Sequence, residues 1–437
     1  MFWLWHSGIV ALNTLGITLG LAAIRPSLAL APPVQIPSTS ALPLAPAQSL
    51  QQLYDIRDRL QAEFTQVSKK ARNATNLGTI AAAPRRSELK QALGTTDLRI
   101  QIEKNAASNL GQALSLAGNI PLLEPTDNSI EQLETIQASW QQAIDLLTDI
   151  PQDAFVAELA REKLDEYKPQ LDFVSYQVDT AKSGFLEAIA ERTGKPANVR
   201  ITVCDLAGEC RRYRGNQRPA DPASLIKVPV AVALMHKVTT ENIDIDEPIK
   251  ISRGNYTEDA SDIWVGQKYP LRKVLQRMIN QSSNIATNQL IEYMGSKYIN
   301  QVLRDRGYSA TIVKTKLIGN RIRPKNQGSP PNYITTDELT DMMMQIYNFK
   351  HPGDDVLVDA LVSQEDLKLG FLALKGKDIH WIGEKTGQNS KMLGTTVGAK
   401  IGDQRYVMTV TLNHTGSERR LRQVIKDVAE HIRQHGL

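Results

Sequence analysis

Cysteine is scarce in this sequence: the 437 residues contain only two. Two cysteines exclude a small fold held together by several disulfides, and they exclude a zinc site built from several thiolates. The seven histidines show no HExxH or comparable metal-ligand spacing, so we expect no metal and no other cofactor. Charge of one sign is also scarce, since 51 basic and 47 acidic residues leave a net charge of +4. This balance gives no reason to expect a nucleic-acid partner.

Long hydrophobic runs are confined to the N-terminus. Residues 8–24 are mostly apolar, but this run is shorter than the about 20 residues that a membrane-spanning helix needs. Small residues at 27, 29 and 31 fit a signal-peptidase site. Residues 1–31 therefore predict a signal peptide that exports the chain to the periplasm or cell envelope. The alternative is an uncleaved membrane tether, because no Lys or Arg precedes the run and Pro32 would disfavour cleavage after Ala31.

The two segments that follow the N-terminal run contain no recognisable catalytic or binding motif. Five prolines between residues 32 and 47 predict an extended linker. Residues 48–181 then carry apolar residues at helical spacing. Within them, Gln112–Pro121 resembles Gln142–Pro151 at an offset of about 30 residues, and each ends in Ile-Pro, which stops a helix. This pattern predicts a short array of helical hairpins that serves as a spacer, or as a docking surface for an envelope protein.

Residues 183–437 read as an α+β domain. Its start predicts a helix over 185–192 and a hairpin of strands over 199–204 and 209–213; its end predicts strands over 395–400 and 405–412 and a helix over 417–434. Strands at both ends, with helices between and after them, indicate one antiparallel sheet covered by helices. Cys204 and Cys210 lie symmetrically about the hairpin turn, so they form either a disulfide or two free thiols.

The first candidate catalytic motif is Ser224-Leu225-Ile226-Lys227, at the start of an apolar helical stretch over 222–238. An i, i+3 spacing places Ser224 and Lys227 on one face of a helix. Serine alone is a poor nucleophile, but an adjacent desolvated amine can accept its proton. Taken alone, such a Ser-x-x-Lys string is weak evidence, since a chain of this length should contain one by chance.

Two further motifs follow in order. Ser282-Ser283-Asn284 falls in a helical stretch over 271–294, and Lys385-Thr386-Gly387 falls in a predicted strand whose glycine would leave backbone exposed for a ligand. The ordered trio is typical of penicillin-recognising serine enzymes.

The domain resembles class A β-lactamases and their penicillin-binding relatives over residues 183–437. This resemblance implies a five-stranded antiparallel sheet packed with helices, together with an all-helical subdomain. It implies that Ser224 is the acylated nucleophile, that Lys227 accepts or relays its proton, and that Ser282 passes a proton to the leaving nitrogen. It further implies that Asn284 contacts Lys227 and binds the side-chain amide of the substrate. Lys385 would add positive potential, and Thr386 would bind the substrate carboxylate. Gly387 completes the third motif, and the backbone N–H groups of Ser224 and Gln388 would form an oxyanion hole.

The resemblance is incomplete at three positions. Ser283 replaces the usual aspartate, which threatens local stability more than mechanism. The family's Glu-x-x-Leu-Asn string, whose glutamate activates the deacylating water, is best matched by Lys314–Ile318, which places Lys314 at the glutamate. Glu292, Asp337 or Glu338 could supply the base if the loop folds differently. No arginine occupies the strand position that often binds the substrate carboxylate; Thr395 falls near it, and Lys391 is the closest cation.

Three functions remain open at this point. The first is hydrolysis of β-lactams, slowed by the missing glutamate. The second is a D-alanyl-D-alanine peptidase acting on peptidoglycan peptides, with the same acyl-serine chemistry. The third is an exported sensor or scaffold whose Ser224 is acylated without useful turnover. The spacer favours the second and third, and the frequency of lactamases in the family favours the first.

Overall fold

The computed structural model describes residues 47–72, 76–121, 128–319 and 321–437. The predicted export segment over 1–31 and nearly all of the predicted linker over 32–47 lie outside the described residues. The chain divides into two compact units: the first runs up to Ala107 and includes residues 153–155, and the second comprises Ser108–Gln152 and Val156–Leu437. Within the described ranges, no helix is both long enough and apolar enough to cross a membrane.

The predicted spacer is helical. Its helices are α1 (Leu50–Arg72), α2 (Asn76–Gly118), α3 (Ile130–Thr148) and α4 (Ala157–Ala181). The helices α2 and α3 each end two residues before an Ile-Pro pair, as the repeat predicts. In the second unit, α3 and α4 pack along each other around Leu133, Ile136, Val174 and Val178.

The sheet of the second unit is five-stranded and antiparallel, as predicted. Its strands are β1 (Val199–Asp205), β2 (Cys210–Tyr213), β5 (Ile379–Gln388), β6 (Met392–Ile401) and β7 (Gln404–Asn413), in the order β2-β1-β7-β6-β5. Nearly every side chain of β6 and β7 is buried, which explains their continuous run of apolar and threonine residues. A disulfide joins Cys204 to Cys210 across the β1–β2 hairpin, so the two cysteines are not free thiols.

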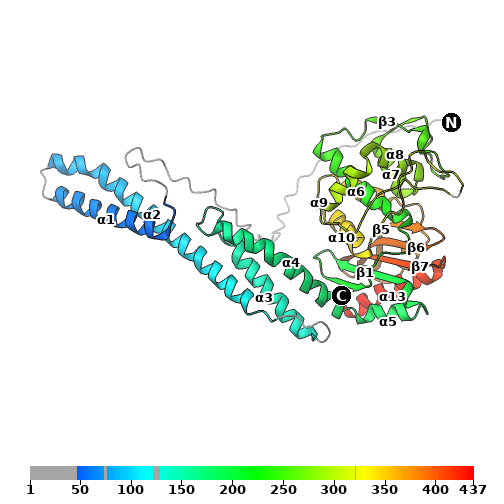
Figure 1. Ribbon diagram of the computed structural model, residues 1–437, viewed down its shortest axis with the longest axis horizontal. Helices are drawn as coiled ribbons and strands as arrows, with labels where there is room; N and C mark the ends of the chain where they lie inside the picture. Colours follow the sequence, from blue (N-terminus) through cyan, green and yellow to red (C-terminus); the bar gives the residue numbers. More distant parts are fainter. Residues whose placement is uncertain (1–46, 73–75, 122–127, 320) are drawn as a thin grey trace, which may run out of the picture. The chain divides into compact units, whose positions relative to one another are not determined.

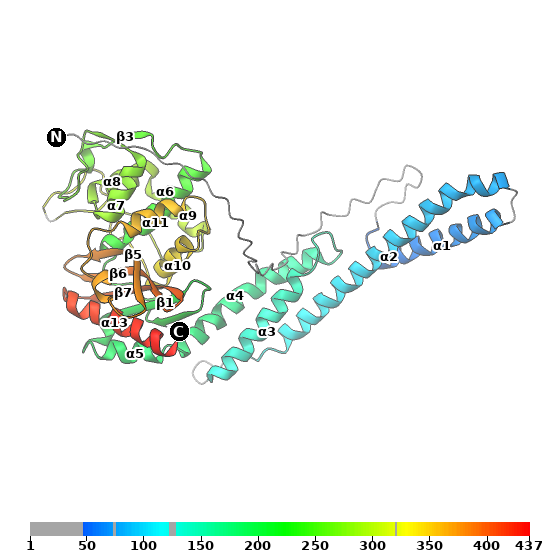
Figure 2. The ribbon, with the colours of Figure 1, turned by 180° about the vertical axis from the view of Figure 1, so that it is seen from behind.

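Helices cover both faces of this sheet (Figure 1). On one face α5 (Gly184–Glu191) and α13 (Glu418–His435) pack against the strands. On the other face α10 (Thr336–Tyr347) contacts β1 and β7. Beyond α10, Figure 2 shows a mainly helical part, which also carries the short strands β3 (Pro248–Lys250) and β4 (Lys268–Pro270). Its helices are α6 (Lys227–Thr240), α7 (Leu271–Asn280), α8 (Asn284–Met294), α9 (Ser296–Asp305) and α11 (Asp354–Val362).

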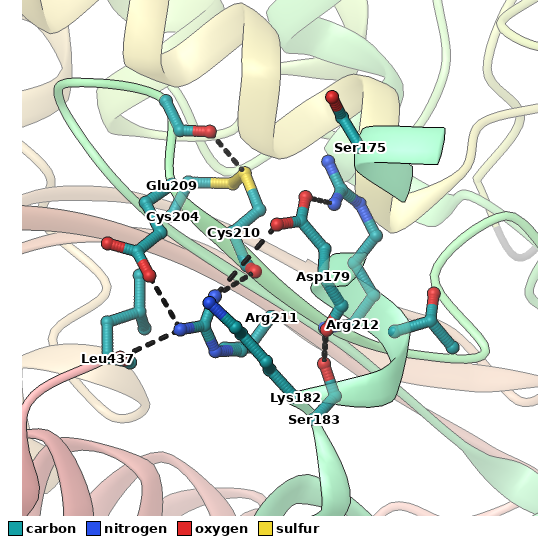
Figure 3. A network of polar contacts seen from close by, with 12 residues as sticks. Ser175, Asp179, Lys182, Ser183, Cys204, Glu209, Cys210, Arg211, Arg212 and Leu437 are labelled. Carbon is teal, nitrogen blue, oxygen red and sulfur yellow. Dashed lines mark hydrogen bonds and ion pairs between the residues drawn. A yellow bond between two sulfur atoms is a disulfide. The ribbon is translucent and has the colours of Figure 1, made fainter. Parts of the chain in front are cut away.

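A polar network ties the end of α4 to β2 (Figure 3). The Asp179 carboxylate accepts a hydrogen bond from Arg212 and lies 3.9 Å from an Arg211 nitrogen. Ser183 Oγ accepts the Arg212 backbone N–H at 2.7 Å. On the same helix, Tyr176 Oη donates to Asp337 at the start of α10. The last helix of the spacer is therefore part of the second unit rather than a free connector.

Candidate active site

The Ser-x-x-Lys motif lies at the start of α6, in the second unit. Residues 223–226 form a 3-10 turn, and α6 begins at Lys227, so the predicted single helix begins with a tighter turn. Because a 3-10 turn holds three residues, Ser224 and Lys227 lie on the same side of it. Ala223, directly before Ser224, has a φ of +45°, a conformation that costs energy for a residue with a side chain. Ser224 is half-buried, whereas Lys227 is 0% exposed.

The second motif lies in a break between two helices. The sequence predicts one helical stretch over 271–294, but α7 ends at Asn280 and α8 begins at Asn284. The reason is that Ser282 adopts a φ of +55°, which a continuous right-handed helix cannot contain. This break turns the Ser282 carbonyl and hydroxyl toward Lys227.

The third motif lies on β5, the edge strand of the sheet beside the Ser224 turn. Gly387 is buried rather than exposed for a ligand, and a Cβ there would lie 2.9 Å from Leu225 Cγ and 3.3 Å from Ser224 N. Glycine is therefore needed because the strand approaches the Ser224 turn so closely. Lys385 is 0% exposed, and Gln388, just past the glycine, is exposed.

The three motifs converge on one hydroxyl. Lys227 Nζ donates to Ser282 Oγ at 3.1 Å and to Asn284 Oδ1 at 3.0 Å, and it also donates to the Ser282 carbonyl. Lys385 Nζ donates to the same Ser282 Oγ at 3.1 Å, and to the Thr386 carbonyl at 2.7 Å. Ser282 Oγ therefore bridges two buried amines.

Burial sets the protonation of both amines. It lowers the pKa of Lys227 well below 10.5, and the charge of Lys385 lowers that pKa further. Burial also lowers the pKa of Lys385, to about 7, although the carboxylates of Asp366 and Glu384 oppose the shift. Although Asp259 opposes the shift at Lys227, burial and Lys385 favour the neutral amine, which is the form that can accept a proton. In that form Lys227 has two N–H donors, so it keeps two of the three donated hydrogen bonds.

The Ser224 hydroxyl makes no hydrogen bond within the described part of the chain, so it is not hydrogen-bonded to Lys227. Its backbone carbonyl accepts the Lys227 N–H. Catalytic hydrogen bonds are often absent without substrate and form only in the complex. The hydroxyl, half-buried and unbonded, is available to a reacting carbonyl.

A carboxylate from another segment compensates for Ser283. Asp259 Oδ2 accepts the Ile285 backbone N–H at 2.9 Å and the Ser283 hydroxyl, while Ser283 Oγ accepts the Ala286 N–H at 3.0 Å. Together the two side chains satisfy free N–H groups at the start of α8. The N–H groups of Ile285 and Ala286 therefore have acceptors although the second motif lacks its aspartate. Sequence analysis missed Asp259 because it lies 24 positions away from Ser283 in a loop.

The loop that should carry the general base holds a leucine near the motif. The Asn288 side chain accepts the Leu317 N–H at 2.6 Å and donates to the Leu317 carbonyl at 2.9 Å. Asn288 lies one helical turn after Asn284, the ligand of Lys227, so Leu317 is held close to that contact. Lys314, which the sequence places at the family's glutamate, is exposed and its amine lies 5.6 Å from the centroid of the Tyr333 ring. Leu317, rather than Lys314, is the residue of this loop that Asn288 holds.

The three alternative bases are all engaged elsewhere. Glu292 pairs with Lys316. Asp337 accepts hydrogen bonds from Thr202 and Tyr176. Glu338 accepts the Ala310 N–H and the Thr311 hydroxyl proton. None of these contacts involves a residue of the three motifs.

The groups near Thr386 include one that the sequence did not point to. Thr386 Oγ1 lies 3.3 Å from Asp366 Oδ2 and donates to it. Thr395 donates to Glu384 Oε2 at 2.7 Å, so its hydroxyl is directed into the buried sheet. Lys391 is exposed in the turn before β6. Asp366 lies in an irregular loop with no recognisable motif, which explains why sequence analysis did not find it.

Comparisons with known proteins agree on the family and the fold. The profile of the β-lactamase enzyme family matches residues 184–435. A β-lactamase from Sphaerobacter thermophilus superposes with a TM-score of 0.50 at 20% identity, covering 58% of this chain and 97% of that one. PBP-A superposes with a TM-score of 0.51 at 21% identity, covering 58% and 97%. A leucine-to-glutamate mutant of PBP-A, in an acyl-enzyme complex with penicillin G, superposes with a TM-score of 0.50 at 21% identity. The match covers 57% of this chain and 97% of that one.

No curated protein matches the sequence. The structural likeness, at 20–21% identity, bears on the fold alone. The family profile covers more than half of the chain and includes all three motifs. This chain therefore belongs to the β-lactamase enzyme family.

Proposed function

We propose that this protein is an exported acyl-serine enzyme in which Ser224 attacks the amide carbonyl of a β-lactam or of a related D-alanyl-D-alanine peptide. Neutral Lys227 accepts the Ser224 proton as the new C–O bond forms. The N–H groups of Ser224 and Gln388 receive the negative charge on the carbonyl oxygen, and each such donor is worth about 10²–10³ in rate.

The leaving nitrogen takes its proton from Ser282. Ser282 Oγ lies 3.1 Å from both Lys227 Nζ and Lys385 Nζ, so it can pass on a proton that Lys227 has accepted. Protonated Lys385 and the Thr386 hydroxyl would attract and bind the substrate carboxylate, while Asn284 would bind the substrate amide. The observation that carries the proposal is this bridge of two buried amines through one hydroxyl, beside an unbonded serine.

Release of the acyl group is proposed to be slow. Leu317, which cannot activate water, is the residue that Asn288 holds next to the Lys227 contact. A lost general base costs about 10²–10⁴ in the step that it serves. PBP-A, which shares the fold, has a leucine whose glutamate mutant is an acyl-enzyme complex with penicillin G. A protein of this fold thus forms an acyl-enzyme with a penicillin, which supports acylation of this chain by the same class of compound.

A D-alanyl-D-alanine peptidase is the second candidate. The leucine favours it over a lactamase, because a peptidase is not selected for rapid release of β-lactam adducts. An envelope location agrees with both candidates: the predicted export segment and the 48–181 spacer would place the domain near peptidoglycan. A non-turnover sensor remains the outcome if neither substrate is turned over.

Two assays on the full mature chain separate these functions. Steady hydrolysis of a chromogenic cephalosporin would support the lactamase. A stoichiometric burst with the cephalosporin, combined with steady release of D-alanine from an acyl-D-Ala-D-Ala peptide, would support the peptidase. A burst without turnover of either substrate would support the sensor, and no burst at all would refute the proposal.

A further inference from the structure

A basic cavity lies outside the proposed active site. It has a volume of about 510 Å³ and lies where the α8–α9 junction meets the segments 252–254, 314–316 and 325–328. No residue of the three catalytic motifs lines it. The volume is in the range of small-molecule binding sites.

The walls of the cavity are fixed by backbone hydrogen bonds. Lys316 N donates to the Gln327 carbonyl at 2.7 Å, and Lys325 N donates to the Gly254 carbonyl at 2.7 Å. Gly328 has a φ of +90°, and a Cβ there would lie 2.2 Å from the Lys314 carbonyl oxygen, so only glycine permits this pairing. The cavity is thus a preformed feature of the loop.

The charge of the cavity is strongly positive. Arg253, Lys314, Lys316 and Lys325 line it, against one carboxylate, Glu292. Lys316, only 5% exposed, is neutralised by Glu292. The other three cations form no ion pair with any residue that the structure describes, which leaves three positive charges without a counter-charge.

The start of α9 adds backbone donors to these charges. Gly295 and Ser296 line the cavity, and no side chain caps this helix end. The first N–H groups of a helix lack intrahelical partners and carry a partial positive charge. Lysine, arginine and helix N–H groups are the donors that bind phosphate oxygens in proteins.

We propose that this cavity binds a small ligand carrying a phosphate or diphosphate group. Such a group brings two or more negative charges to three unpaired cations, and its tetrahedral oxygens accept from Arg253, Lys314, Lys325 and the α9 N–H groups. A neutral ligand would cover these cations without pairing them, which is costly. The site is separate from Ser224, so its occupancy does not require acylation.

Calorimetric titration of the full mature chain with inorganic pyrophosphate tests the proposal. We expect saturable binding with one site per chain. Replacing Arg253, Lys314 and Lys325 singly by glutamine should weaken it roughly tenfold or more each, since each loses a charged hydrogen bond. Arg323→Gln is the matched control, because Arg323 is an exposed cation of the same loop that does not line the cavity; its affinity should not change.

Three results would overturn the proposal. The first is that pyrophosphate does not bind at millimolar concentration. The second is that Arg323→Gln loses as much affinity as the cavity variants. The third is that tricarballylate binds as tightly as pyrophosphate, which would make the site a carboxylate site. A thermal-shift titration gives an independent readout, because a ligand bound to the folded state raises its melting temperature. For a variant whose melting temperature is lower even without ligand, the quantity compared is the rise in melting temperature that the ligand causes. None of these measurements depends on acylation, so their failure leaves the proposed function untouched.

Discussion

At the residue scale, the central feature is the competition between two buried amines for one hydroxyl. Two ammonium groups that share Ser282 Oγ repel each other, so protonation of one disfavours protonation of the other. The carboxylates of Asp366 and Glu384 partly oppose the lowering of the Lys385 pKa, as Asp259 does for Lys227. The pKa of Lys227 is also lowered by the charge of Lys385, which favours the charge on Lys385 and a neutral Lys227. One site thereby contains both a proton acceptor and a cation.

The pH dependence of acylation follows from these shifts. Below its lowered pKa, Lys227 is an ammonium that cannot accept a proton, so the rate should rise with pH as Lys227 becomes neutral. Above pH about 7, Lys385 loses the charge that attracts the substrate carboxylate, and the rate should fall. Stopped-flow acylation by a penicillin should therefore give a bell-shaped profile.

The methyl ester of the same penicillin is the control for this profile. Because the ester has no carboxylate for Lys385 to attract, its rate should rise with pH without the fall above about 7. A fall of equal size for both compounds would contradict the role of Lys385.

Leu317 gives a second prediction at this scale. Leu317→Glu places a carboxylate beside the Asn284–Lys227 contact, where it can activate water. We expect deacylation of the penicillin adduct to accelerate by about 10²–10⁴. Leu317→Gln is the control, because glutamine has the shape of glutamate but cannot act as a base. Its deacylation rate should stay near that of the natural protein. If the glutamine variant accelerated deacylation equally, a general base would not be the missing group.

At the element scale, the site depends on how α8 begins. The helix starts at Asn284 directly after the left-handed Ser282, so the capping contacts of Ser283 and Asp259 fix the groups that bind Lys227. The aspartate that the family usually has in the second motif is thus replaced by two residues: Ser283 in the motif and Asp259 in a separate loop.

Removing that carboxylate should destabilise the domain. Asp259→Ala leaves the Ile285 N–H and the Ser283 hydroxyl without their acceptor, which costs about 1–3 kcal/mol in the free energy of unfolding. Adding Ser283→Asp should recover part of this loss, because aspartate is itself a good helix cap. Urea denaturation measures both effects. Asp403→Ala, at a fully exposed aspartate, should change stability by less than about 0.5 kcal/mol.

Elements were easier to predict from the sequence than their junctions. The strand predicted over 405–412 is observed as Gln404–Asn413, and the helix predicted over 417–434 as Glu418–His435, because their apolar periodicity reflects burial directly. The break at Ser282 was not predictable, since it depends on one backbone angle that tertiary contacts impose. Asp259 and Leu317 were missed because they reach α8 from distant loops, whose spacing a motif does not constrain.

At the scale of the whole molecule, the end of α4 is held to the sheet by a buried charge cluster. Burial raises the pKa of Asp179, and the nearby Arg212 and Arg211 oppose that shift. The cluster therefore need not be more stable than an apolar contact, yet removal of Asp179 leaves the partly buried Arg212 with only the longer contact to Asp337, at 3.4 Å.

Loss of Asp179 should loosen this attachment. Asp179→Ala removes the nearest carboxylate of Arg212, which is 17% exposed and then keeps only Asp337 at 3.4 Å, whereas Arg211 keeps Glu209 at 2.6 Å. We expect a cost of about 1–3 kcal/mol in the free energy of unfolding. Hydrogen exchange should become faster in the second half of α4, and chemical denaturation should show the loss. Glu134→Ala removes a more exposed ion pair with Lys182 and should cost less than about 1 kcal/mol. Equal effects of the two variants would contradict the structural role of the cluster.

The proposed chemistry of the whole protein depends on acylation of Ser224, and intact-mass spectrometry during incubation with a penicillin measures it directly. The account predicts that the full mass of the penicillin is added once per chain, that the adduct persists long after free penicillin is removed, and that Ser224→Ala shows no adduct. An adduct of the same mass on Ser224→Ala, or no adduct on the natural protein, would contradict it.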